Sequence, residues 1–201
     1  MYDIELIKPF GPFILECMCP DDVLTKFNSF VDNMDQDTKE ICSSKHSKVE
    51  GFPDLLDRGF EIIFMTGEQL GDIGFTNFIA GATKEYCKVY NIEKPNVRYN
   101  DCEFSNIFVD AWVNRYFNNN YTPPHDHSGH ISGITILELP KESNWNDLHS
   151  LEFVWSNEQH RPEQKNGKTF LFDSKLMHWV QKQQCVSERR TLSFNLFVGQ
   201  S

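Results

Sequence analysis

The sequence predicts one α+β domain in which helical segments come first and a sheet of short strands follows. Before Pro95 hydrophobic residues recur twice at helical spacing, and after it they alternate with a period of two in short runs. Aromatic residues make up 13% of the chain and gather in these β-like runs, which favours a sheet-rich core. A length of 201 residues fits a single domain, 1–201, with its own hydrophobic core. We expect a helical part over about 1–95 and a β-sheet core over about 96–201.

The N-terminal part begins with two short β-like runs, 4–7 and 13–17, before the first helix. Asp21 and Asp22 follow Pro20, and acidic side chains are favoured at the start of a helix. The apolar face of this helix is formed by Val23, Phe27, Phe30, Val31 and Met34. A polar loop is expected at 43–50, a short extended piece at 61–66, and a second amphipathic helix over about 71–91.

The C-terminal part has the pattern of an all-β structure. A strand is expected over 107–117, and three consecutive asparagines, 118–120, signal a turn behind it. Further strands are expected at 131–139, 151–155, 168–172, 177–181 and 191–198. Short strands joined by Gly, Pro and Asn turns favour a sandwich or a partly open barrel.

Charge and cysteine content exclude several classes of protein. A formal net charge of −10 repels phosphate backbones and anionic membranes, and no basic run exceeds Arg189-Arg190, so a nucleic-acid partner is not expected. Six cysteines without a Cys-x-x-Cys pair are too sparse for a disulfide scaffold, and we expect Cys17-x-Cys19 to be ordinary cysteines. The sequence shows no signal-peptide pattern and no membrane span, which predicts a cytoplasmic protein.

Three histidines form a candidate metal site. His125 and His127 point the same way only if their segment is extended, and Asp126 then faces away. His178 lies in a later β-type run, which a barrel could bring to the same place. Imidazoles suit iron, copper, nickel, cobalt and zinc, and three of them leave coordination positions open, as in catalytic sites. The alternative is a pair of exposed histidines and a core-edge histidine beside Trp179.

Arg189 and Thr191 form a candidate carboxylate site. They share one face of the expected last strand, and a guanidinium with a neighbouring hydroxyl can hold a carboxylate through charge-assisted hydrogen bonds. The alternative is a surface ion pair between Arg189 and a nearby acid such as Glu188.

These motifs together resemble a known family. His125-x-His127 within Pro123–Gly129, a strand after Gly167, His178, and Arg189-x-Thr191 eleven residues later resemble the Fe(II)- and 2-oxoglutarate-dependent dioxygenases, in particular small oxygenases of bacteriophages. The resemblance covers about 107–198. It implies a double-stranded β-helix, or cupin-like jelly roll, with the N-terminal helices packed against it.

The resemblance also implies the roles of individual residues. His125, His127 and His178 would bind Fe(II), and Arg189 with Thr191 would hold the distal carboxylate of 2-oxoglutarate. Asn114 and Tyr116 are similar to an Asn-x-Tyr pair that helps hold the cosubstrate in the related alkylation-repair dioxygenases. The alternative for this last pair is a strand whose polar residues point outward.

The sequence departs from most of that family at one ligand. His127 stands where an aspartate or glutamate is usual, so the site has one negative charge fewer. Asp126 would replace that carboxylate only if the strand bulged, and His130 is a further candidate ligand beyond Gly129.

The implied activity is oxidation of an unidentified substrate, a small molecule or a protein side chain, with release of succinate and CO2. The compartment would be the host cytoplasm for a phage-encoded protein. One alternative is a three-His cupin-type metalloenzyme without 2-oxoglutarate, in which Arg189 lies away from the metal. Another is a non-catalytic interaction module that binds through Trp145 and Trp155. Segments 141–149 and 155–160 are expected to be loops that flank the barrel mouth.

Overall fold

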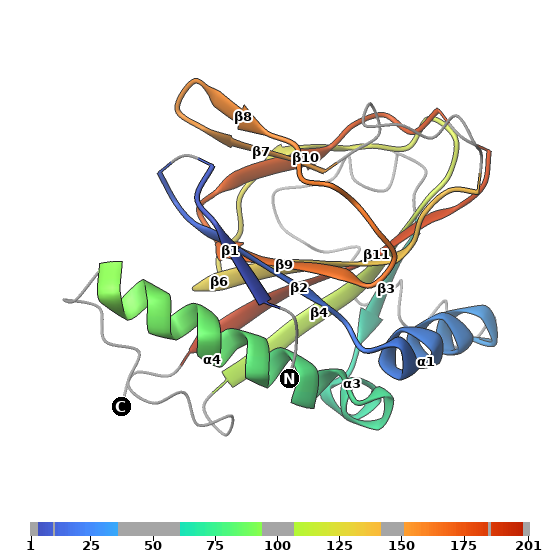
Figure 1. Cartoon of the computed structure of the whole chain (residues 1–201). Coiled ribbons are helices and arrows are strands. Elements are labelled where there is room, and N and C mark those ends of the chain that lie inside the picture. Colours follow the sequence, from blue (N-terminus) through green and yellow to red (C-terminus); the bar gives the residue numbers. More distant parts are fainter. Residues whose placement is uncertain are drawn as a thin grey trace.

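Two β-sheets packed face to face, with helices covering one of them, make up the described part of the chain (Figure 1). The computed structural model describes residues 4–9, 11–35, 61–93, 107–141, 151–184 and 186–198. The expected loop at 43–50, most of that at 141–149, and Trp145 lie outside the described residues. No helix in the described ranges is long and apolar enough to cross a membrane.

The larger sheet has seven strands, and all of its pairs are antiparallel. Their order is β1 (Ile4–Ile7), β2 (Ile14–Met18), β9 (Lys168–Asp173), β6 (Ile131–Glu138), β11 (Arg189–Val198), β4 (Ile107–Tyr116) and β3 (Glu61–Met65). The smaller sheet has the order β5 (Thr122–His125), β10 (Met177–Val180), β7 (Leu151–Trp155) and β8 (Glu158–His160). From β4 to β11 the described chain passes back and forth between the two sheets. This confirms the expected double-stranded β-helix.

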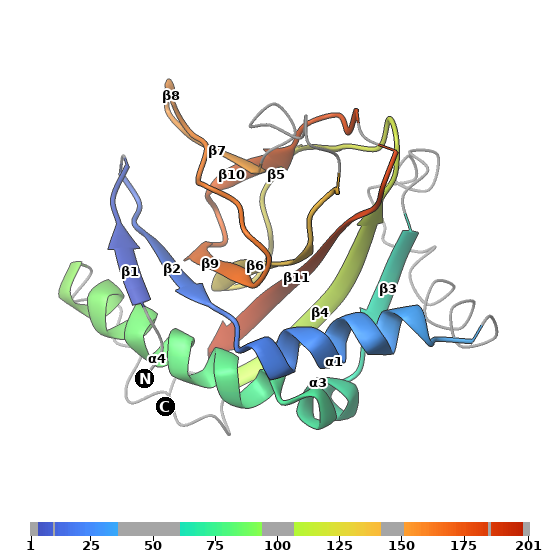
Figure 2. The same ribbon diagram turned by 45° about the vertical axis from the view of Figure 1, so that its right-hand side comes forward.

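Helices α1 (Asp21–Asp32), α3 (Gly67–Ile73) and α4 (Phe75–Glu93) lie along the outer face of the larger sheet (Figure 2). Of the apolar positions expected for α1, Val23, Phe27 and Val31 are buried, Phe30 is partly buried, and Met34 is buried beyond the end of the helix. They pack with the outward-facing side chains of the sheet, such as Leu192 and Phe194 of β11. Because successive side chains on a strand alternate between faces, Thr191, Ser193 and Asn195 point to the other side, between the sheets.

A second apolar cluster fills the space between the two sheets. It includes Ile134 and Ile136 of β6, Phe170 and Phe172 of β9, and Phe153 of β7. The jelly-roll interior is therefore a packed core at the β6–β9 side and polar along β11. This asymmetry places the polar inner face of β11 where a ligand can reach it.

Three local expectations were wrong in detail. The helix expected over about 71–91 is two helices, because Gly74 adopts a left-handed conformation (φ 91°) that ends α3. Helix α3 begins earlier than expected, at a capping box between Thr66 and Gln69. Residues 155–160 are no loop but the end of β7, a two-residue turn at Ser156 and Asn157, and the whole of β8; Ser156 takes a positive φ of 58°.

Candidate functional site

His125, His127 and His178 lie together, with their ligand atoms within 4.8 Å of one another. His125 on β5 stands directly opposite His178 on β10. The β5 ladder ends at His125, and His127 lies two residues beyond it, where its N–H donates to the carbonyl oxygen of Ser174 (2.9 Å). The strand pairing therefore supplies two imidazoles, and the segment that follows β5 supplies the third.

Hydrogen bonds fix the orientation of two of the rings. The Nδ1 of His125 lies 2.8 Å from the carbonyl oxygen of Pro123, and that of His178 lies 3.0 Å from the carbonyl oxygen of Leu176. A carbonyl oxygen only accepts, so each Nδ1 carries the hydrogen and each Nε2 keeps its lone pair. The Nε2 atoms of His127 and His178 are 3.2 Å apart. Without a metal, the Nε2–H of His127 can donate to the Nε2 of His178. In its other tautomer His127 turns a lone pair toward the other two rings, and the three nitrogens then fit a shared metal ion.

The electrostatics keep these imidazoles neutral. Burial, with the neighbouring histidines, holds the pKa of His178 well below its ordinary value. Burial and His125 lower the pKa of His127 to about 3, and burial lowers the pKa of His125. Neutral imidazole is the form that binds metals, so the site needs no deprotonation at neutral pH.

The other two candidate ligands lie outside the cluster. Asp126 is exposed and pairs with Lys175 (3.4 Å), whose ammonium also donates to the carbonyl oxygen of His127. It therefore faces away from the three rings, as the spacing predicted. His130 is exposed, and its ring lies beside Phe197.

Arg189 is completely buried on the inner face of β11. Its guanidinium lies over the ring of Tyr116 at 5.3 Å, and its Nη2 donates to Oε1 of Gln164 (2.9 Å). Within the part of the chain that the structure describes, its Nε and Nη1 have no hydrogen-bond partner. Burial lowers the pKa of Arg189 to about 10, because a cation is poorly solvated there. A buried guanidinium with two such nitrogens has the hydrogen-bond donors to hold an anion.

The alternative of an ion pair with Glu188 is wrong. Glu188 bonds instead to Arg115 (2.7 and 2.8 Å) and to Arg190 (2.8 Å), whose side chain points to the helix side of the sheet and reaches Asp32 of α1. Adjacent arginines therefore have opposite roles because the strand alternates. Arg190 holds the helix, and Arg189 enters the jelly roll.

Thr191, Asn114 and Tyr116 lie beside Arg189. In the β4–β11 register Tyr116 is opposite Arg189, and Asn114 is opposite Thr191. The Tyr116 hydroxyl is 2.8 Å from that of Thr122, and the Asn114 amide donates to Ser193 (2.9 Å). Burial raises the pKa of Tyr116, so its hydroxyl stays protonated. Both β4 residues are buried and face inward, so the alternative of outward-pointing polar residues is wrong for this pair.

The two halves of the site come from the two facing sheets, the histidines from the smaller sheet and Arg189 from the larger one. The ring of Trp112 lies 5.7 Å from that of His127, and Trp112 is opposite Ser193. Arg189 is four residues before Ser193, about 13 Å along the strand at the usual rise. An extended arginine side chain and a five-carbon dicarboxylate together span such a distance. The residues present therefore fit Fe(II) with 2-oxoglutarate.

Some residues that surround the candidate site have no recognisable sequence pattern. Trp112, Phe153 and Phe172 surround the histidines, with ring separations of 5.7, 6.1 and 4.8 Å, but in the sequence they were ordinary strand aromatics. Gln164 lies in an irregular segment between β8 and β9. Only its contact with Arg189 in three dimensions draws attention to it.

Comparison with known proteins agrees with this geometry. Residues 110–195 match the family model described as "Putative 2OG-Fe(II) oxygenase", a span that contains the three histidines and Arg189. None of the curated protein sequences matches the chain.

Solved structures of similar fold come from several organisms. A prolyl-4-hydroxylase from Pseudomonas putida aligns with a TM-score of 0.52 and 14% identity, over 100% of this chain and 95% of that one. JOX2, solved with 2OG, Fe and JA, aligns with a TM-score of 0.58 and 11% identity, over 89% of this chain and 63% of that one. The auxin dioxygenase AtDAO1 from Arabidopsis thaliana, solved with 2-oxoglutarate, aligns with a TM-score of 0.57 and 10% identity, over 96% of this chain and 85% of that one.

At these identities the structural likeness shows the fold alone. The chain also spans less than two thirds of the length of JOX2 and of some other structures that it matches. The family match is independent of that likeness and covers the segment that builds the site. Over residues 110–195 this chain matches the 2OG-Fe(II) oxygenase family, on a jelly roll that solved 2-oxoglutarate oxygenases share.

Proposed function

We propose that the protein is a non-haem Fe(II)- and 2-oxoglutarate-dependent oxygenase. The observation that carries this proposal is the pairing of two features inside the jelly roll. Three imidazoles converge, and a completely buried arginine of the facing sheet has two nitrogens without partners in the described part of the chain. The family match over the same residues supports it.

Each residue of the site has a distinct role in the proposal. His125, His127 and His178 hold the iron through nitrogens whose rings are fixed by backbone carbonyls or by neighbouring rings. Arg189, Thr191 and Tyr116 hold the distal carboxylate. Asn114 donates to Ser193 and so helps to fix the polar side chains between the carboxylate and the iron. When bound, iron and 2-oxoglutarate would couple two oxidations, that of the substrate and that of 2-oxoglutarate to succinate and CO2, to the reduction of O2. The aromatic rings around His178 exclude water from the metal side.

An anaerobic titration tests the proposal. Purified protein is mixed with Fe(II) and then with 2-oxoglutarate, and the weak visible charge-transfer band of the chelated keto acid is followed. We expect the band in the wild type, and we expect Arg189→Ala to need much higher 2-oxoglutarate concentrations for it. The absence of a band in the wild type, or an identical titration for the variant, would contradict the assignment. Succinate release measures turnover separately.

The three-His enzyme without 2-oxoglutarate is the less favoured alternative. It expects Arg189 to lie away from the metal, whereas Arg189 lies on the same inner face of the larger sheet as Trp112, whose ring is 5.7 Å from that of His127. An interaction module is favoured only by Trp155, which is 45% exposed. Neither alternative accounts for a buried arginine without an anion.

The substrate and the place of action are proposals that rest on the sequence. The acidic chain favours a small molecule or a protein side chain over a nucleic acid. We propose an origin among the phage-type oxygenases and action in the cytoplasm, the host's if the gene belongs to a phage. Assay of cleared lysate for new hydroxylated products, with and without the protein, would test the substrate class.

A further inference from the structure

Gln164 lies against Arg189 and is incompletely bonded. Its Oε1 accepts the hydrogen bond from Nη2 of Arg189 (2.9 Å), whereas its own Nε2 is buried and has no partner. Arg189 leaves Nε and Nη1 without partners as well. Two side chains bonded to each other thus present three buried nitrogen donors with no acceptor.

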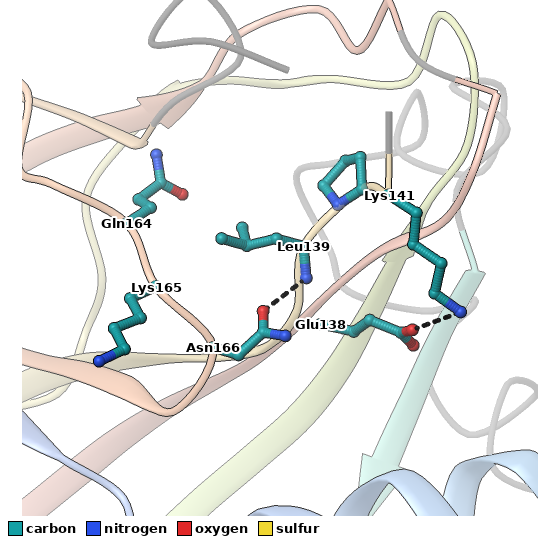
Figure 3. A pocket seen from close by; sticks show the side chains of 7 residues that line it. Glu138, Leu139, Lys141, Gln164, Lys165 and Asn166 are labelled. Atoms are coloured by element: carbon teal, nitrogen blue, oxygen red, sulfur yellow. Dashed lines mark hydrogen bonds and ion pairs between the residues drawn. The ribbon is translucent and has the colours of Figure 1, made fainter. Parts of the chain in front are cut away.

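Gln164 also lines a pocket of about 500 Å³ (Figure 3). Gln164, Lys165 and Asn166 line one side of it, and 138–141 line the other. Two bonds link other polar groups drawn there, since Lys141 pairs with Glu138 (3.3 Å) and Asn166 accepts from the backbone of Leu139 (2.8 Å). Among these residues, the buried amide nitrogen without a partner is the Nε2 of Gln164, whose Oε1 accepts from Arg189.

Unsatisfied buried donors indicate the chemistry of the missing ligand. Leaving a buried donor unpaired is destabilising, so three at one place are costly unless a ligand accepts from them. A carboxylate only accepts, and it has about four lone-pair sites. It can take two hydrogen bonds from the guanidinium and still take one from an amide.

We propose that Gln164 is a binding residue for the distal carboxylate of 2-oxoglutarate. Its Nε2 donates to that carboxylate, while its Oε1 orients the guanidinium of Arg189. This inference rests on the proposed function, because it assumes that Arg189 receives the cosubstrate. Gln164 thereby becomes a determinant of selectivity for dicarboxylic over monocarboxylic keto acids.

Calorimetric binding to the Mn(II)-loaded protein tests the inference without turnover. The two ligands are 2-oxoglutarate and 2-oxopentanoate, which has a methyl group in place of the distal carboxylate. We expect Gln164→Leu to weaken 2-oxoglutarate binding about tenfold to a hundredfold, the usual effect of losing a hydrogen bond to a charged group. Binding of 2-oxopentanoate should not change. Lys165→Ala, a neighbouring exposed residue, is the matched control and should bind both acids like the wild type.

Gln164→Glu separates donation from positioning and has nearly the same shape. The carboxylate still accepts from Arg189 but cannot donate, and it repels a second carboxylate, so we expect an even larger loss of 2-oxoglutarate binding. If Gln164→Glu binds 2-oxoglutarate as well as the wild type, Gln164 only positions Arg189 and the inference is wrong. Equal weakening of both acids would likewise show a structural effect.

The failures of the two proposals are distinguishable. One outcome overturns only the role of Gln164 and leaves the proposed function standing. In it, the wild type and both Gln164 variants bind 2-oxoglutarate normally, and Arg189→Ala does not. Wild type that does not bind 2-oxoglutarate overturns both. Thermal unfolding of each variant without ligand identifies any loss caused by misfolding.

Discussion

The Nε2 atoms of His127 and His178 face each other 3.2 Å apart, although 51 residues separate them in the chain. The opposite nitrogen of His178 is tied to the carbonyl oxygen of Leu176, so its tautomer is set before any metal arrives. Without a metal the Nε2–H of His127 can donate to the Nε2 lone pair of His178, and a metal ion can replace that hydrogen bond by binding both nitrogens. The site is thus arranged in advance for a metal, and several measurable consequences follow.

Metal binding should stabilise the fold through His178. A metal present at a hundred times its Kd adds about 2.7 kcal/mol, which raises the Tm of a chain of this size by about 5–10 °C. His178→Ala should abolish most of this rise and weaken Mn(II) binding about a hundredfold or more. Differential scanning with and without Mn(II) measures both. His130→Ala, outside the cluster, is the control, and a wild-type Tm unaffected by Mn(II) would argue against a metal site.

Replacing His127 by aspartate should change the redox behaviour of bound iron. A carboxylate adds one negative charge to the site, and this favours the more highly charged ferric ion. We expect His127→Asp to retain iron and to show a lower Fe(III)/Fe(II) potential than the wild type in voltammetry. His127→Asn has a similar size without the charge. A potential that is the same in the Asp and Asn variants would show that the charge of the third ligand does not set it.

The Glu188 carboxylate should make stability depend on pH in the acid range. Burial alone would raise its pKa, but the hydrogen bonds from Arg115 and Arg190 and their charges outweigh this and lower the pKa to about 2. Its stabilisation is therefore complete above the unfolded pKa near 4.5 and is lost as the pH falls toward 2. We expect Glu188→Gln to cost about 2 kcal/mol in urea unfolding at pH 7 and much less at pH 3.

The control for Glu188 is an exposed acidic residue of a surface pair. Asp22 has a side chain that is 73% exposed and lies 4.0 Å from Lys26. Asp22→Asn should change stability little at either pH, since surface pairs contribute about 0–1 kcal/mol. If Glu188→Gln lost the same stability at pH 3 as at pH 7, the coupling to its ionisation would be absent.

Gly133 should not tolerate a methyl group. A Cβ there would lie 2.2 Å from the ring of Phe194 and 2.9 Å from the carbonyl oxygen of Phe170. Phe194 is held in turn by the ring of Phe75 at 5.3 Å, so it cannot move away freely. We expect Gly133→Ala to cost about 3 kcal/mol in urea unfolding.

A second glycine provides the opposite expectation. Nothing lies within 4 Å of a Cβ at Gly71 in α3, so Gly71→Ala should stabilise the protein by about 0.5–1 kcal/mol. A similar result for both substitutions would mean that the packing of Phe194 over Gly133 is not as tight as the structure shows.

Local patterns were sufficient for much of the fold. The period-two runs and the helical spacing of Val23, Phe27 and Val31 gave most element positions, because burial of one face is encoded in the periodicity itself. They failed at Gly74, where one residue's backbone conformation divides a helix that the hydrophobic pattern treats as continuous. They failed also at β8, three residues long, since so short a strand exists only through its pairing with β7.

The sequence by itself determined the chemistry available to this protein. Histidines at i and i+2 on an extended segment, and an arginine two residues from a threonine on a strand, follow from residue order and strand alternation alone. Tertiary structure decided which of these groups would meet. The pairing of β5 with β10 set His125 opposite His178, and the β4–β11 register set Tyr116 against Arg189. The tertiary structure also brought Gln164 into contact with Arg189. Contacts between distant segments depend on how the sheets pack, and no local sequence pattern records that packing.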